Sequence, residues 1–258
     1  MSAVDALLSR LDVTRGGLVY LHTSFSRLRH LAANPQELLA GVLRYLGPDG
    51  TLVLPSFAWH LDPTQRPWKG YADYYRLRPP FDVRRTPSNI GSVPECFRTW
   101  PGVRRSADFW WSVAAVGPLA SILTNHQHLI EHPYGPDSSF HRLWQNGAQI
   151  VGLGVSLNTT SLAPVVDFVM GSRHPQRVFS ESKQEGLVID EHGREIITRT
   201  FWLLPEVVRT IKPSEVLTRS NGLEGRLRRA DEGDTIHFAY AFGDYLEQAL
   251  QLGDDSVR

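Results

Sequence analysis

The sequence is poor in cysteine and lysine: Cys96 is the only cysteine, and Lys69, Lys183 and Lys212 are the only lysines. A single cysteine excludes an intramolecular disulfide and fits a reducing compartment. The first residues, MSAVDALLSRLD, lack the apolar run of a signal peptide. No stretch approaches the roughly 18 apolar residues that a membrane span needs. We therefore expect a cytoplasmic protein with no membrane partner.

The sequence also has no net charge, because 27 basic residues balance 27 acidic ones. Phosphate backbones are bound by basic surfaces, so this balance argues against nucleic acid as the main partner. Nearly all of the positive charge is arginine, a residue that suits anion recognition. Hydrophobic residues make up 41% and charged residues 21% of the chain, as in an ordinary globular protein with one core.

Strand and helix patterns alternate near the N-terminus. The run GLVYLH at 17–22 predicts a buried strand, and TLVL at 51–54 predicts a second one. Between them, Asn34, Pro35 and Glu37 form a helix start, leucines follow at helical spacing, and Gly47 ends the helix. This order is a βαβ unit, which implies a parallel strand pair with a right-handed crossover.

The remaining elements are predicted from shorter signals. Residues 112–116 and 150–155 are expected as strands, and a helix is expected to begin near Ser161 or Leu162. Residues 187–190 and 195–200 are expected to form a hairpin around His192. The tail from 234 to 252 is expected as a closing helix. No linker composition interrupts the chain, so we expect a single domain spanning residues 1–258.

Three motifs place polar residues where chemistry is expected. The first, His22 to Ser26, puts hydroxyls just after a strand, where they either bind an anion or cap a helix. The second combines TPSNIG at 86–91 with Phe97-Arg98, Pro101-Gly102 and Arg105-Ser106. The third is NTTSL at 158–162, which leads to Asp167.

Taken in order, these motifs resemble the core of the aminoglycoside 3-N-acetyltransferase family, antibiotic acetyltransferases that use acetyl-CoA. The resemblance implies an α/β fold: a three-layer α/β/α sandwich around a mostly parallel sheet, with the hairpin as a small excursion. It implies an acyl-CoA-dependent N-acyltransferase that moves an acetyl group from acetyl-CoA to a small-molecule amine, such as an amino sugar. A homodimer is also compatible with it.

The resemblance assigns roles to particular residues. Cofactor binding falls to Thr23, Ser24, Phe25, Ser26, Thr86, Ser88, Gly91, Arg105 and Ser106. Arg105 is expected to meet a phosphate, because its guanidinium donates two parallel hydrogen bonds. Catalysis falls to Asp167, His22 and Thr160.

The sequence departs from the family pattern at two places. The family continues Arg-Ser with His-Pro, whereas Asp108-Phe109-Trp110-Trp111 follows here, either as an altered acceptor wall or as rebuilt core. The family motif Asn-Thr-Ser-Leu-His-x-x-Glu holds the base that deprotonates the amine. No histidine occurs here between 158 and 173, and Asp167 does not align cleanly with the glutamate.

The absence of this base matters for catalysis, because general-base catalysis typically raises the reaction rate by about 10²–10⁴-fold. An aspartate near its reference pKa of about 3.9 is a poor base unless burial raises that value. Three outcomes stay open: Asp167 or His22 substitutes, the acceptor is less basic, or turnover is lost. The last would leave a catalytically impaired ligand-binding protein on the acyltransferase scaffold.

Weaker signals complete the sequence. Aromatic residues crowd the 58–80 loop and suit sugar or adenine contacts as well as core packing. His126, His128 and His132 fit no common zinc spacing, so we expect no metal site, and a metal-dependent hydrolase is the third alternative. No Gly-x-Ser-x-Gly elbow is present, which argues against a serine hydrolase.

Overall fold

The computed structural model describes residues 1–58, 80–174, 177–201, 212–218 and 226–257. The predicted aromatic loop therefore falls almost entirely outside the described residues. A seven-stranded sheet forms the centre, in the order β4-β5-β2-β1-β6-β10-β9. Its strands are β1 (Leu18–Thr23), β2 (Thr51–Pro55), β4 (Arg104–Arg105), β5 (Val113–Val116), β6 (Gln149–Leu153), β9 (Arg228–Arg229) and β10 (His237–Ala241).

The central three strands are parallel, with β1 between β2 and β6. The outer pairs β2–β5, β5–β4, β6–β10 and β10–β9 are antiparallel. It follows that β4 and β9 point the same way as the central three, and only β5 and β10 point back. The segments after β1, β2, β4, β6 and β9 and those before β5 and β10 therefore meet at one edge, which we call the carboxyl edge.

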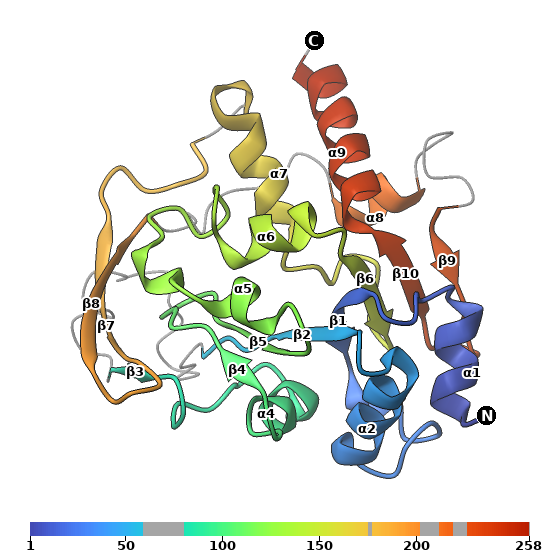
Figure 1. Cartoon of the computed structure of the whole chain (residues 1–258). Coiled ribbons are helices and arrows are strands. Elements are labelled where there is room, and N and C mark those ends of the chain that lie inside the picture. The colour runs from blue at the N-terminus through green and yellow to red at the C-terminus, as the bar shows by residue number, and fades with distance from the viewer. Residues whose placement is uncertain (59–79, 175–176, 202–211, 219–225, 258) are drawn as a thin grey trace.

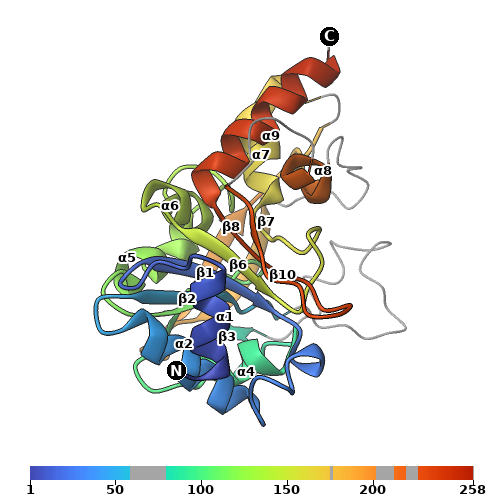
Figure 2. The same cartoon turned by 90° about the vertical axis from the view of Figure 1, so that its right-hand side faces the viewer.

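Helices cover both faces of the sheet, as the three-layer prediction requires (Figure 1). Below the sheet in that view lie α1 (Ala3–Arg10), α2 (Pro35–Leu46) and α4 (Ser92–Arg98). Above it lie α5 (Ala120–Thr124), α6 (Ser139–Gln145), α7 (Ala163–Met170), α8 (Pro213–Thr218) and α9 (Phe242–Val257). Helices α7 and α9 pack side by side (Figure 2). Each face of the sheet thus has its own apolar core.

The predicted start of α2 is confirmed in atomic detail. The Asn34 side chain accepts a hydrogen bond from the Glu37 amide, and Pro35 occupies the first turn. Gly47 ends the helix with a φ of 75°, a conformation that favours glycine. Local chemistry therefore determines this element without help from the rest of the fold.

The prediction for the C-terminal tail is partly wrong. Residues 237–241 form β10 rather than helix, and α9 begins only at Phe242. The segment HFAYA is buried along almost its whole length and lies between β6 and β9. A short apolar run of this kind does not distinguish a buried strand from a buried helix, so the sheet decides.

A second, three-stranded sheet contains the predicted hairpin: β7 (Gln184–Ile189) and β8 (Glu195–Thr200), with β3 (Phe81–Asp82) beside β7. Phe109 and Trp110 are buried in an apolar cluster with Phe81 and Val188. A Cβ added at Gly186 would lie 2.9 Å from the Phe109 ring, so the contact is tight. Of the two alternatives for the Phe-Trp run, the structure supports rebuilt core for Phe109 and Trp110.

Three short 3-10 helices complete the described chain: η1 (Phe25–Arg27), η3 (Gln127–Leu129) and η4 (Gly171–Arg173). None of the helices in the described ranges is long and apolar enough to cross a membrane.

Candidate functional site

The predicted cofactor residues after β1 lie at the carboxyl edge, where open α/β sheets bind ligands. The Ser24 amide donates to the Leu153 carbonyl at 3.0 Å, and its hydroxyl lies 3.3 Å from that of Ser26. Ser24 precedes η1 but makes no side-chain capping bond, so the helix-cap alternative is not realised. The Thr23 hydroxyl is buried without a hydrogen bond to any described residue. Phe25 packs partly against the core that includes α2.

Arg105, at the end of β4, is buried with 7% exposure. Its guanidinium donates to the carbonyls of Thr86 at 2.5 Å and Ser56 at 2.6 Å and to the Ser112 hydroxyl at 3.1 Å. It also lies 4.6 Å from the centre of the Phe81 ring. These contacts join four chain segments, so the geometry favours a structural role. Phosphate binding by Arg105 stays a prediction.

The residues around Arg105 are also fixed by internal contacts. The Thr86 hydroxyl accepts from the Asp82 amide at 2.8 Å, and the Ser106 hydroxyl accepts from the Val113 amide at 2.9 Å. The Ser88 amide donates to a carboxylate oxygen of Glu95 at 2.6 Å. Gly91 precedes α4 with a φ of 141°. The structure thus brings the second motif together beside the end of β2, as a rigid border rather than a loose loop.

His22 lies near the end of β1 with 5% exposure, and its ring meets Tyr20 edge-on at 4.9 Å. Its Nε2 has no hydrogen-bond partner among the described residues. Burial lowers the pKa of His22 to about 4, so the imidazole is neutral near pH 7. Neutral imidazole accepts a proton, but a pKa this low makes it a weak base.

Thr160 lies in the loop that follows β6, close to the buried hydroxyl of Tyr240. Burial raises the pKa of Tyr240 well above its usual value, and the neighbouring Thr160 hydroxyl opposes that shift. Ser161 has the same relation to Tyr20, whose pKa burial also raises. Since Tyr20 also contacts His22, Ser161 of the third motif and His22 of the first motif lie on either side of this tyrosine.

Asp167 lies on α7 and is buried with 7% exposure. Its Oδ1 is 3.7 Å from Nε2 of His174, whose side chain is 1% exposed. Pro164 is accommodated in the first turn of α7, where a proline does no harm. His174 lies one residue beyond the 158–173 stretch that has no histidine, so the family motif does not point to it.

Two groups of polar residues lie outside these motifs. A pocket of about 430 Å³ beneath the β7–β8 turn is lined by Arg104, Arg105, Ala107, Thr124, Asn125, His126, His128, Asp190, Glu191, His192 and Arg194. Across the described ranges, one group has metal-ligand geometry: His30, Glu232 and His237, with ligand atoms within 4.8 Å of one another. Burial lowers the pKa of His237.

Comparison of the sequence with known protein families identifies the family of the chain. The family model described as aminoglycoside 3-N-acetyltransferase matches residues 20–203. The chain belongs to this family. Membership confirms the predicted reaction class, CoA-dependent N-acetyl transfer with acetyl-CoA as the donor.

Curated relatives in this family cover nearly the whole chain. The chain is 32% identical to aminoglycoside N(3)-acetyltransferase IX of Micromonospora chalcea, over 90% of this chain and 89% of the relative. It is 28% identical to aminoglycoside N(3)-acetyltransferase III of Pseudomonas aeruginosa, over 96% of this chain and 90% of the relative.

Solved structures of the family confirm the fold. The complex of AAC-IIIb with CoASH superposes with a TM-score of 0.80 at 21% identity, over 98% of this chain and 96% of that one. AAC-VIa bound to sisomicin superposes with a TM-score of 0.74 at 22% identity, over 98% and 96%. At sequence identities of 21% and 22%, these structures show only that the fold is the same.

Proposed function

We propose that this protein acetylates an amino group of an aminoglycoside-like amino sugar with acetyl-CoA as donor. The observation that carries the proposal is the family match over residues 20–203, together with 32% identity to an aminoglycoside N(3)-acetyltransferase over 90% of the chain. The coenzyme is placed at the carboxyl edge. There the Thr23–Ser26 turn follows β1. The Thr86–Gly91 segment lies beside the end of the adjacent strand β2, where Arg105 donates to the carbonyls of both Thr86 and Ser56.

The acceptor amine must lose a proton, and the pair His174–Asp167 is our proposed proton acceptor. The His174 Nε2 atom lies 3.7 Å from Asp167 Oδ1, so a carboxylate faces the imidazole that would take up the proton. His22, with its pKa near 4, is the weaker candidate. In this reading the family's histidine and carboxylate are both replaced, and the imidazole comes from beyond the end of α7.

The reaction itself is tested by incubation with acetyl-CoA and a panel of aminoglycosides and simpler amines, with free thiol as the readout. We expect thiol release that requires an acceptor, and an acetylated product by mass spectrometry. Calorimetric binding of CoA without thiol release from any amine would instead support the impaired ligand-binding alternative.

The proton acceptor is tested by His174→Gln and Asp167→Asn. Loss of general-base help predicts a fall in kcat of about 10²–10⁴-fold for His174→Gln, with a smaller fall for Asp167→Asn. KM for acetyl-CoA is expected to change little. His192→Gln, a change at an exposed histidine, is the matched control. Full activity of a folded His174→Gln protein would transfer the role to His22, which His22→Gln then tests.

Three further properties belong to this proposal: a single domain over residues 1–258, a homodimer and a cytoplasmic location. The single domain is supported by the shared sheet on which both helical layers pack. One cooperative unfolding transition tests the first property, light scattering tests the second and cell fractionation tests the third.

A further inference from the structure

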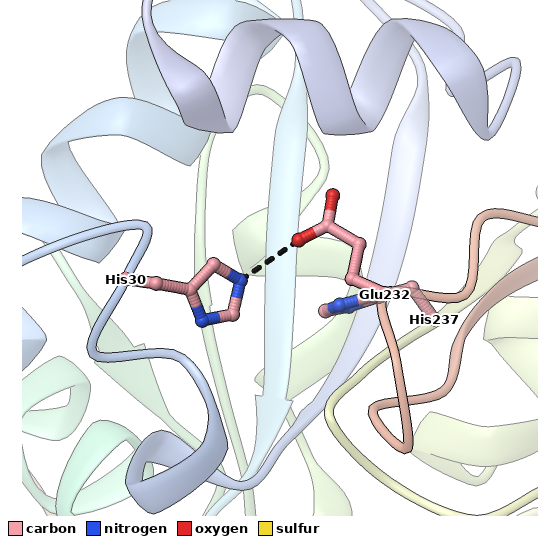
Figure 3. A group of neighbouring side chains, drawn as sticks. All are labelled: His30, Glu232 and His237. Atoms are coloured by element: carbon pink, nitrogen blue, oxygen red, sulfur yellow. Dashed lines mark hydrogen bonds and ion pairs between the residues drawn. The ribbon is translucent and has the colours of Figure 1, made fainter.

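Three side chains outside the proposed catalytic machinery converge at the carboxyl edge (Figure 3). His30 follows η1, whereas Glu232 and His237 flank the turn between β9 and β10. The His30 and His237 ring centres lie 6.4 Å apart, and each of the three residues has a ligand atom within 4.8 Å of the other two. Two imidazoles and one carboxylate are a common donor set for zinc.

His237 is the residue that calls for an explanation. Its side chain is fully buried, and neither ring nitrogen has a hydrogen-bond partner among the described residues. Buried polar atoms are nearly always paired, with protein groups, ordered water or an ion, so the His237 ring is placed to bind one of the latter two. A cation would pair one of the two ring nitrogens, and the other would still need an acceptor such as water.

The carboxylate is already oriented for such a ligand. Glu232 Oε2 lies 2.9 Å from Nε2 of His30, and Glu232 Oε1 accepts from the Arg10 guanidinium at 2.9 Å. Arg10 thus holds one oxygen and leaves the other facing the two imidazoles. Ligand groups held by outer hydrogen bonds of this kind are typical of metal sites.

We propose that His30, Glu232 and His237 bind a divalent transition metal, with zinc as the ion that the donor set favours. Zinc bonds of about 2.0–2.2 Å at a tetrahedral angle place ligand atoms roughly 3.3 Å apart. The present separations, up to 4.8 Å, need only a small inward movement of the side chains. Three protein ligands leave a fourth position for water.

The site would fasten two segments that meet beside the coenzyme turn. β10 pairs with β6 at His237 and Leu153, and a Cβ added at the next residue, Gly154, would lie 3.2 Å from the Ser24 carbonyl. A metal would therefore connect the segment from Ser24 to His30 with the β9–β10 hairpin. The inference does not rest on the acetyltransferase activity, because metal binding is measured without substrate.

The test uses tag-free full-length protein, first stripped with a chelator. Zinc titration by calorimetry is expected to give one equivalent bound, and cobalt is expected to give an absorption spectrum typical of tetrahedral sites. His30→Ala and Glu232→Gln should each weaken zinc binding by more than about tenfold, since even changes outside the ligand shell cost that much. Zinc should also raise Tm in the unmodified protein but not in a double variant that carries both His30→Ala and Glu232→Gln.

The matched control is His126→Asn with His128→Asn, which removes a different histidine pair of the described residues, also 6.4 Å apart between ring centres. Asparagine tolerates the positive φ of 61° at position 126. This variant should bind one equivalent as before. No zinc binding to folded protein, or unchanged binding in the His30→Ala, Glu232→Gln double variant, would overturn the proposal.

Discussion

At the scale of single residues, two buried polar side chains at the carboxyl edge, His22 and Arg105, affect stability in different ways. His22 has a titrating group where water does not reach, so its charge state depends on folding. Arg105 has a permanent charge that is satisfied by the protein's own carbonyls. Each residue leads to a prediction about stability, and the two differ in their dependence on pH.

For His22 we predict a stability loss in acid. The pKa is 6.5 in the unfolded chain and about 4 in the folded one, so between these values the unfolded state binds more protons. The free energy of unfolding should therefore fall as pH drops from 6.5 towards 4, by up to about 3 kcal/mol from this group. His22→Gln should flatten that dependence in urea unfolding curves. His192→Gln, at an exposed site, should leave it unchanged.

For Arg105 we predict a loss of stability rather than a simple loss of coenzyme affinity. Arg105→Met leaves the buried carbonyls of Thr86 and Ser56 without their donor, and each unpaired buried group costs about 1–3 kcal/mol. The free energy of unfolding should fall by roughly 2–6 kcal/mol at any pH from 5 to 8. If the folded variant keeps its stability but its KM for acetyl-CoA rises, Arg105 binds phosphate and the structural reading is wrong.

At the scale of elements, close packing against β10 restricts which side chains fit in β6. A Cβ added at Gly152 would lie 2.3 Å from the Phe238 ring on the neighbouring strand β10. The glycine thus makes room for an aromatic ring and is not needed for a turn. Its role could not be predicted from the sequence, because the partner strand was itself expected as helix.

We predict that Gly152→Ala destabilises the protein by about 1–3 kcal/mol or more, through overpacking. Adding Phe238→Leu should recover part of the loss, so that the two changes together cost less than their sum. Gly243→Ala in α9 is the control, since the nearest atom to its added Cβ is 3.9 Å away. Thermal and urea unfolding are measured for Gly152→Ala, Phe238→Leu, their double variant and Gly243→Ala. If the stability costs of the two single changes simply add in the double variant, positions 152 and 238 do not interact.

Elements with local signals were predicted well, and elements that depend on distant pairing were not. Asn34, Pro35 and Gly47 bracket α2 through capping chemistry that lies within the segment itself. By contrast, the direction of β5 and the existence of β10 are decided by neighbouring strands. The candidate site divides in the same way: the residues predicted for it come from motifs contiguous in sequence, whereas the proposed proton acceptor His174 lies outside every motif. His30 and Glu232, 202 positions apart, share no spacing that a sequence search could use.

At the scale of the whole molecule, coenzyme binding is predicted to stabilise the fold. A ligand that binds only the native state adds about 2.7 kcal/mol when present at 100 times its Kd. CoA and acetyl-CoA should therefore raise Tm by several degrees in a thermal shift assay. Adenosine alone should have a smaller effect. If saturating CoA leaves Tm unchanged, the proposed coenzyme site at the carboxyl edge is wrong.

The reversed direction of β5 and β10 has a consequence for how such an enzyme can change over time. A purely parallel sheet supplies one rim only with residues that follow its strands. Here the rim also receives the residues that precede two of them, so many independent stretches of chain border the same edge of the sheet. A proton acceptor lost from one stretch can be replaced from another while the scaffold stays still. Divergence of the chemistry and persistence of the architecture are thus compatible in one protein.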